Sequence, residues 1–384
     1  MIRITRNYTY YEETGCITMT KTVISDLKPG MFTAAPVYSA TGQLILPEHS
    51  LLTVQQISRL EFYGVEWVAI IPEEDLQNSS LEELSDNSQE DILSYSQKIR
   101  RSKDFHLFRI DYGKKVTLLQ SSLNDLLMKN TTIDADSLLE QVGSLYQNNK
   151  TTLSIFDMLH NMRQIDDSTY AHSLNVALIA RMLGIWVGLS EDDLETLTLA
   201  GLLHDIGKCM ISPEIITKPA GLTPAEYEEV KKHPRYGAEV LENQPLDKRV
   251  IRAALMHHER CDGSGYPMGL KAAEIDDFAK IIAIADVYDA MTANRCYRKG
   301  LCPFEVIATF ERDGLVKYDS RYILTFLNRI VDTYIRNSVL LNDGTCGEIV
   351  LMNQKSLSRP VVHTRTNEYI DLAKHPELHI QAII

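Results

Sequence analysis

The chain has 384 residues, of which 44% are hydrophobic, and its formal net charge is −13 at neutral pH. This length is enough for two or three domains, while the acidic balance argues against binding of a nucleic-acid polymer by bulk charge, so any phosphate site must be local. Because the sequence has no long apolar run and its six cysteines show no CxxC pairing, we expect no membrane insertion and a reduced, cytoplasmic protein.

The N-terminal part predicts a small module followed by a linker. Residues 1–18 read as a leader without the apolar stretch of a signal peptide, which makes Met19 a candidate for the native start. Residues 19–72 predict an α+β module, with strands at 36–38, 44–47 and 66–71 and a helix at 51–63. Residues 73–91 hold eight acidic residues and no basic one, which is typical of a solvated linker.

Helical periodicity dominates the rest of the chain up to residue 337. Residues 92–152 predict a helical connector with one buried apolar stripe, and residues 153–337 predict an all-α domain. Its expected helices cover residues 174–183, 194–206, 224–241, 250–256, 278–293 and 321–334. Residues 338–384 then predict a β-rich appendix, because the turn Asn342-Asp-Gly-Thr precedes two short apolar runs.

The sharpest motif is the segment LLHDIGK at residues 202–208. It places His204 and Asp205 at an expected helix end, and a carboxylate there can bridge two metal ions. Lys208 follows at a spacing that brings its ammonium to the same side of a continuing helix, where it suits phosphate oxygens. A lone His-Asp pair is more often only hydrogen-bonded. The interpretation of this motif as a metal site therefore depends on further candidate ligands.

Four further histidines supply that support. His172 lies in an apolar helix, His233 is expected at the end of the helix preceding it, and His257 and His258 follow another apolar segment. Each alone could be an ordinary packed histidine. Five histidines near helix ends or on apolar faces indicate instead a metal centre, and imidazoles with carboxylates suit iron, manganese or zinc.

Two carboxylates share one face of the strongly apolar segment 278–293. Asp286 and Asp289 are three residues apart, and a carboxylate buried in such a helix must be paired or bound to metal. Asp286 is therefore a candidate metal ligand. Both carboxylates could instead pair with arginines such as Arg295.

A glycine-rich loop follows the histidine pair in the segment HHERCDGSGYP at residues 257–267. Gly265 permits a close backbone approach, and Tyr266 with Pro267 places a rigid aromatic ring where a nucleobase could stack. Arg295 and Arg298 follow the buried helix and could clamp a phosphodiester, or could be an ordinary solvated basic stretch.

Together these segments resemble the HD-GYP family, a branch of the HD metal-dependent phosphohydrolases, over about residues 155–330. The resemblance rests on His172, LLHDIGK at 202–208, His233-Pro234, the segment 257–267 and DVYDAMTANRCYR at 286–298. It implies a mainly α protein, with an all-helical HD-type catalytic domain at 153–337 between the α+β module and the β-rich appendix. It also implies a phosphodiesterase that hydrolyses cyclic di-GMP to pGpG or to GMP in bacterial signalling.

The resemblance also implies two divalent transition-metal ions, iron or manganese. One ion would bind His172, His204, Asp205 and Asp286, and the other would bind His233, His257 and His258, with Asp205 as the bridge. Asp205 and Lys208 would be catalytic, and the substrate would contact Lys208, Gly265, Tyr266, Pro267, Arg295 and Arg298. Ser168 stands where some members carry a glutamate for a third metal, so two ions are expected. Cys296 replaces the usual proline between the last arginine and tyrosine.

Three alternatives stay open at this point. The same fold could act on another cyclic dinucleotide such as cyclic GMP-AMP, or it could bind the dinucleotide without cutting it. The N-terminal module or the glycine-rich loop could also dock protein partners, and the chain could form a homodimer. The intact set of seven metal-binding side chains favours catalysis over simple binding.

Overall fold

The computed structural model describes residues 7–9, 18–28, 30–38, 44–46, 50, 52, 56–57, 60, 63, 65–71, 99–129, 131–147, 152–162, 169–216, 218, 220–293 and 300–384. These residues form two compact units. One comprises residues 1–93 with 102–117, and the other comprises 94–101 with 118–384. Among the described helices, none is both long enough and apolar enough to cross a bilayer.

The first unit contains two small antiparallel sheets. One has the strand order β1-β2-β5, formed by β1 (Asn7–Thr9), β2 (Thr18–Val23) and β5 (Trp67–Ile70), and the other pairs β3 (Val37–Tyr38) with β4 (Leu44–Leu46). A short 3₁₀ turn, η1 (Ile24–Asp26), follows β2. The strands expected at 36–38, 44–47 and 66–71 are thus present. Most of the helix expected at 51–63 lies outside the described residues.

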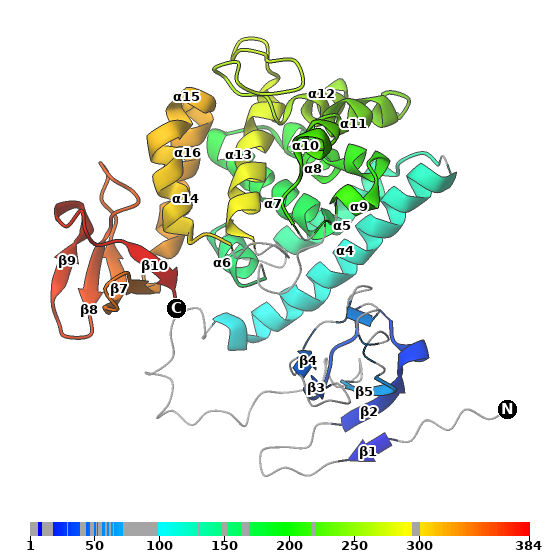
Figure 1. Ribbon diagram of the computed structural model, residues 1–384, viewed down its shortest axis with the longest axis horizontal. Coiled ribbons are helices and arrows are strands. Elements are labelled where there is room, and N and C mark those ends of the chain that lie inside the picture. Colours follow the sequence, from blue (N-terminus) through cyan, green and yellow to red (C-terminus); the bar gives the residue numbers. More distant parts are fainter. Residues whose placement is uncertain are drawn as a thin grey trace. The chain divides into compact units, whose positions relative to one another are not determined.

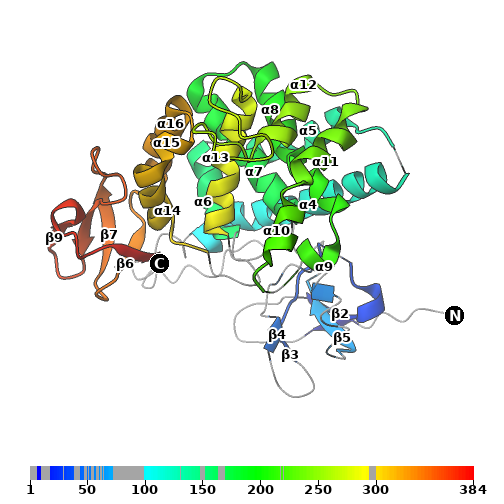
Figure 2. The same ribbon diagram turned by 45° about the horizontal axis from the view of Figure 1, so that its top comes forward.

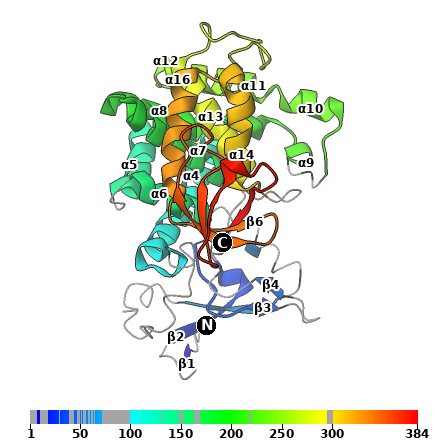
Figure 3. The ribbon, with the colours of Figure 1, turned by 90° about the vertical axis from the view of Figure 1, so that its left-hand side faces the viewer.

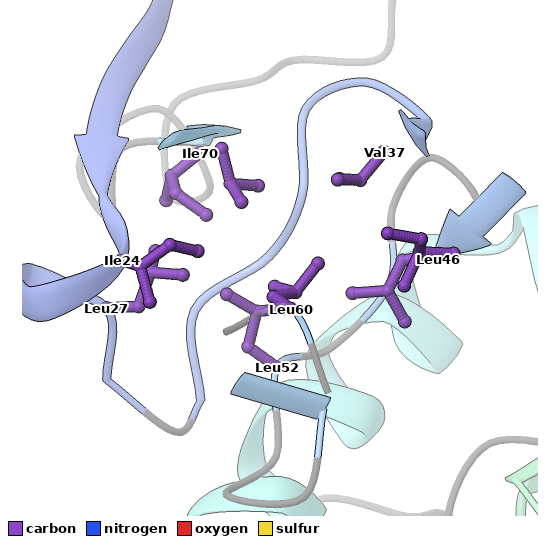
Figure 4. Close-up of a cluster of buried hydrophobic side chains, with 9 residues drawn as sticks. Ile24, Leu27, Val37, Leu46, Leu52, Leu60 and Ile70 are labelled. Atoms are coloured by element: carbon purple, nitrogen blue, oxygen red, sulfur yellow. The ribbon is translucent and has the colours of Figure 1, made fainter. Parts of the chain in front are cut away.

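A compact apolar cluster holds this unit together. Its buried members come from both sheets and from the segments that connect them, as Figure 4 shows: Ile24, Leu27, Val37, Ile45, Leu46, Leu52, Leu60, Val68 and Ile70. The alternation of buried Val68 and Ile70 with exposed Trp67 along β5 is the period-two pattern of a strand with one buried face. Strand β1 lies within residues 1–18, which were expected to be a leader without a strand.

Three helices precede the apolar helices at the centre of the second unit: α4 (Lys103–Lys129), α5 (Ala135–Gln147) and α6 (Thr152–Met162). The expected apolar stripe of the connector is largely buried along α4. Phe105, Phe108, Val116, Leu119, Leu123 and Leu126 are buried, with Tyr112 added to the stripe, whereas Leu127 is only partly buried. The stripe repeats at helical spacing, which is why this segment forms one long helix.

The all-α part of the second unit is arranged around two apolar helices, α7 (Thr169–Val187) and α13 (Asp277–Thr292), which pack on each other. In Figures 1 and 2 they lie among the other helices of this unit. The surrounding elements are α8 (Glu191–Leu203), η3 (Ile206–Met210), α9 (Pro213–Ile216), α10 (Pro224–Val230), α11 (His233–Glu242), α12 (Lys248–Met256), α14 (Pro303–Thr309), the π-helical turn η4 (Phe310–Gly314), α15 (Leu315–Lys317), α16 (Ser320–Ile330) and η5 (Val331–Tyr334).

One expected helix is divided in the structure. The segment 224–241 forms α10 and α11 with a turn between them, and His233 begins α11 instead of ending the preceding helix. The physical reason is Pro234, which has no N–H to donate to the carbonyl of Val230 and whose ring would clash with it. The break therefore leaves the carbonyl of Val230 available for another donor.

The C-terminal segment forms a five-stranded antiparallel sheet in the order β10-β6-β7-β8-β9, which Figure 3 shows in front of the helices of its unit. The strands are β6 (Ser338–Leu341), β7 (Cys346–Leu351), β8 (Val361–Thr364), β9 (Tyr369–Asp371) and β10 (Ile380–Ile383), with η6 (Leu372–Lys374) before the last. The expected turn at Asn342 connects β6 to β7. The carboxylate of Glu311 in η4 accepts hydrogen bonds from Leu357 and Ser358 and so ties the sheet to the helices. The predicted mainly α fold with small flanking sheets is confirmed.

Candidate metal centre

The seven expected metal ligands come from six helical elements of one unit. His172 lies in the first turn of α7, His204 caps the C-terminus of α8, and Asp205 precedes η3. His233 begins α11, His257 and His258 follow α12, and Asp286 lies in α13. Helix ends therefore supply most of these side chains. All seven are buried except His258, which is partly buried.

The structure brings these side chains together around Asp205. Ligand atoms of Asp205, His233, His257 and His258 all lie within 4.8 Å of one another, and so do those of His172, His204 and Asp205. Asp286 joins the two groups from another side, because its Oδ1 lies 3.1 Å from Nε2 of His172 and its Oδ2 lies 3.7 Å from Nδ1 of His258. The two groups share Asp205, whose two oxygens face different histidines.

Backbone carbonyls orient three of the histidines. Nδ1 of His204 lies 2.8 Å from the carbonyl oxygen of Gly201, Nδ1 of His233 lies 2.7 Å from that of Val230, and Nδ1 of His257 lies 2.9 Å from that of Ala254. A carbonyl oxygen only accepts, so each Nδ1 must carry the proton. Each neutral ring then presents the lone pair of Nε2 to the centre, which is the form that binds a metal ion.

The carbonyl of Val230 connects this orientation to the break between α10 and α11. Pro234 occupies the position whose N–H would otherwise bond to Val230, and the free carbonyl accepts Nδ1–H of His233 instead. The proline next to His233 thus helps to set the direction of the imidazole. The packing of Gly207 supports the same residue, since a Cβ at Gly207 would lie 2.0 Å from the carbonyl oxygen of His233.

Unsatisfied polar atoms indicate that the centre is built for cations. Among the described residues, neither Nε2 of His204 nor Oδ1 of Asp205 has a hydrogen-bond partner, although both atoms are buried. Nε2 of His233 also lies only 3.2 Å from Nε2 of His257, although both rings use Nδ1 as the donor. Buried lone pairs that face one another are costly unless a cation lies between them. The donor set therefore fits divalent transition metals.

His172 is oriented by a carboxylate that the sequence had left ambiguous. Oδ2 of Asp289 lies 2.8 Å from Nδ1 of His172, on the ring edge opposite to Asp286. Burial by itself would lower the pKa of His172, but the hydrogen bonds to Asp286 and Asp289 raise it to about 9. Asp289 thus holds the ring of His172, a candidate metal ligand, in its orientation. The spacing of Asp286 and Asp289 on one helical face was the sequence signal for this role.

Burial keeps the adjacent histidines His257 and His258 neutral. It lowers the pKa of His257 to about 4, and burial together with the neighbouring His257 holds the pKa of His258 well below its usual value. Burial would raise the pKa of Asp205, but Lys208 and His204 hold it well below its usual value. At neutral pH His257 and His258 thus offer neutral imidazoles and Asp205 an ionised carboxylate, which are the forms that metal binding requires.

Lys208 lies beside the centre on η3. Its ammonium is 2.5 Å from Oδ2 of Asp205, and its side chain is partly exposed. The expected α-helix does not continue here, because His204 ends α8 and η3 is a 3₁₀ turn, but the i to i+3 spacing still brings the two charges together. Lys208 is therefore positioned to meet an anion that approaches Asp205.

The glycine-rich loop covers one side of the histidine pair. The ring of Tyr266 stacks on that of His258, with centroids 4.6 Å apart, and the N–H of Tyr266 donates to the carbonyl of His258. Gly265 allows this close approach, since a Cβ there would lie 2.4 Å from the backbone of Glu259. Pro267 follows through a cis peptide bond. The expected loop residues thus lie at the centre, whereas Arg295, Arg298, Cys296 and Ser168 lie outside the described residues.

Glu259 is a buried loop residue that the sequence reasoning missed. Its carboxylate accepts hydrogen bonds from the N–H groups of Met268 at 2.7 Å and Leu270 at 2.9 Å. These bonds close the loop that carries Tyr266. A buried acidic residue directly after a histidine pair was the available signal, because it must find donors in its surroundings.

Comparisons with known proteins show what the chain is similar to. Residues 142–322 match the HD domain family. The chain is 32% identical over 234 residues to a cyclic di-GMP phosphodiesterase of Pseudomonas aeruginosa, a match that covers 60% of this chain and 55% of that protein. It is 37% identical over 145 residues to a 3′3′-cGAMP-specific phosphodiesterase of Vibrio cholerae, covering 38% of this chain and 32% of the relative. The chain thus spans about half, or less, of the length of these relatives.

A solved structure shares the fold. The chain resembles an HDG"Y"P protein from Bdellovibrio bacteriovorus with a TM-score of 0.50 and 18% sequence identity, over 80% of this chain and 98% of that one. At this identity the likeness concerns the fold alone.

Proposed function

We propose that the chain, whose residues 142–322 match the HD domain family, is a metal-dependent phosphodiesterase that hydrolyses cyclic di-GMP to linear pGpG or to GMP. The observation that carries the proposal is the position of Asp205, which belongs to both groups of candidate ligands. A carboxylate shared in this way is the arrangement that a two-metal phosphodiesterase needs. The names of the similar proteins favour a cyclic dinucleotide as the substrate.

The seven side chains would hold two divalent transition-metal ions, iron or manganese. His172, His204 and Asp286 would bind one ion and His233, His257 and His258 the other, with Asp205 as the bridge. When bound, such ions make water a nucleophile near neutral pH and polarise the phosphoryl oxygens. The chain itself orients the imidazoles through Gly201, Val230, Ala254 and Asp289, and excludes bulk water by burial.

Residues beside the ligands would bind the substrate. Lys208 would stabilise the negative charge that develops on the phosphoryl oxygens, because its ammonium already lies at Asp205. The ring of Tyr266 would offer a stacking surface to a nucleobase, held in place by Gly265 and Pro267. Arg295 and Arg298 stay predictions as further phosphate contacts.

The test is turnover by the purified chain. Protein prepared without oxygen and loaded with iron or manganese should convert cyclic di-GMP to pGpG or GMP, which chromatography separates. Asp205→Asn and His204→Ala should each lower kcat/KM by at least about a thousandfold, since they remove candidate ligands. His379→Ala is the matched control, because His379 is an exposed histidine that directly precedes β10. Full turnover by the Asp205 variant would refute the proposal.

A second candidate substrate is the hybrid dinucleotide cyclic GMP-AMP. The similarity to a protein named for cyclic GMP-AMP is the reason to test this dinucleotide as a second substrate. Measuring kcat/KM for cyclic di-GMP, cyclic GMP-AMP and cyclic di-AMP side by side decides between them. Tight binding without product in either metal would instead assign the chain to the non-catalytic sensors.

A further inference from the structure

A second cation lies next to the glycine-rich loop. Lys231 caps the C-terminus of α10, two residues before His233 begins α11. Its ammonium lies 5.7 Å from the ring centroid of Tyr266 and 5.7 Å from that of Tyr227. Tyr266 in turn stacks on His258. The break between the two helices thus brings a lysine to the same loop that borders the metal centre.

The surroundings of Lys231 combine a positive charge with open aromatic surface. The side chain of Lys231 is partly exposed, and Tyr227 is about half exposed (50%). Cations within about 6 Å of a ring centroid are attracted to the ring face. The two tyrosines therefore hold the ammonium at the border of the centre while one of them keeps surface free for a ligand.

Binding of a cyclic dinucleotide requires a second cation of this kind. It carries two phosphodiester groups and two bases, and only one phosphodiester can be cut at a time. Lys208 lies at Asp205 and, under the proposed function, would bind the phosphate at the metals. Because the chain has a net charge of −13, the second phosphate also requires a local cation. We propose that Lys231, with Tyr227 and Tyr266, binds the second phosphate and an adjacent base of the dinucleotide; this inference rests on the proposed function.

The simpler interpretation is that Lys231 only forms a surface ion pair. Its ammonium lies 3.0 Å from Glu228 in an i to i+3 pair, and such exposed pairs contribute little to stability. Lys232 provides the comparison, because it forms the same kind of pair with Glu229 at 2.6 Å. Only Lys231 combines this pair with a position over the tyrosine of the glycine-rich loop. The two lysines therefore form a matched pair for an experiment.

Binding of cyclic di-GMP to the full chain tests the assignment directly. Calorimetry on metal-free protein should give a dissociation constant about tenfold weaker for Lys231→Met than for the wild type, as expected for the loss of one charged contact. Lys231→Arg should recover most of the affinity, and Lys232→Met should bind as the wild type does. Equal effects of Lys231→Met and Lys232→Met would overturn the assignment, because both would then reflect bulk charge.

Turnover separates this inference from the proposed function. Lys231→Met should raise KM for cyclic di-GMP more than it lowers kcat, and it should affect bis(p-nitrophenyl) phosphate much less, since that diester has a single phosphate. An equal loss on both substrates would place Lys231 at the metals and overturn the inference. A wild type that binds the dinucleotide without cutting it would refute the proposed function, and the ratio of the dissociation constants would still decide the role of Lys231.

Discussion

Oδ2 of Asp289 lies 2.8 Å from Nδ1 of His172, while the other ring nitrogen of this histidine faces Asp286 at 3.1 Å. The two carboxylates are one turn apart on α13 and have different roles. Asp286 reaches into the centre, and Asp289 fixes the orientation and the tautomer of a candidate ligand. Carboxylates behind metal-binding histidines also raise their basicity.

Asp289→Asn should therefore weaken metal binding without removing any candidate ligand. The amide oxygen can still accept the hydrogen bond from His172, but the negative charge is lost, so the affinity for the ion at His172 should fall by about 10- to 100-fold. Titration with manganese, followed by calorimetry, measures this change. Asp277→Asn is the control, since Asp277 lies in the first turn of the same helix, is exposed and pairs with Lys280 at the surface. Equal affinities for the Asp289 variant and the wild type would contradict the prediction.

Part of this arrangement could be predicted from the sequence, and part could not. Apolar periodicity indicates helices such as α7 and α13. Residue types at helix ends indicate His204 and His257 as ligands, and a carboxylate within an apolar helix indicates Asp286. Periodicity cannot show which acceptor a given Nδ1 will find, because that depends on the tertiary packing. Helical periodicity was also read across the whole of 224–241, although Pro234 was visible, so it did not show that His233 begins a second helix.

Gly207 should be required for the position of His233. A Cβ at residue 207 would lie 2.0 Å from the carbonyl oxygen of His233 and 2.5 Å from the backbone nitrogen of Gly237, and backbone atoms cannot move aside cheaply. Gly207→Ala should lower the free energy of unfolding by about 1–3 kcal/mol and weaken metal binding at His233. Denaturant titration and metal titration measure the two effects. At Gly221 a Cβ would meet no atom within 4 Å, so Gly221→Ala should change neither quantity.

The start of α10 should show a clear pH dependence. Glu226 accepts hydrogen bonds from Lys218 and from the N–H of Thr223, and these bonds lower its pKa from 4.5 to about 2. Because the pKa in the folded state is depressed, the stabilisation is present above pH 4.5 and is lost as the pH falls toward 2. Carbon NMR of the Glu226 carboxyl should show no titration down to pH 3.5. Lys218→Met should shift its pKa upward toward 4.5, and Lys232→Met should leave it unchanged.

Glu259 should hold the glycine-rich loop in place. Its buried carboxylate accepts from Met268 and Leu270, and a glutamine could offer an oxygen to only one of these N–H groups while its own amide N–H would face the other. The loss of one charged hydrogen bond costs about 1.5–3 kcal/mol, so the loop should open more often in Glu259→Gln. Amide hydrogen exchange at Met268 and Leu270 should accelerate by at least about tenfold.

The same substitution should affect catalysis through Tyr266. A loop that opens more often would hold the ring of Tyr266 less firmly against His258, so KM for cyclic di-GMP should rise by about tenfold, with a smaller change in kcat. Glu274→Gln is the matched control, because Glu274 accepts from the N–H of Lys271 at 2.9 Å but is exposed. Unchanged exchange at both amides in Glu259→Gln would show that other contacts hold the loop. If KM rose without faster exchange, Glu259 would act on the substrate by another route than the loop.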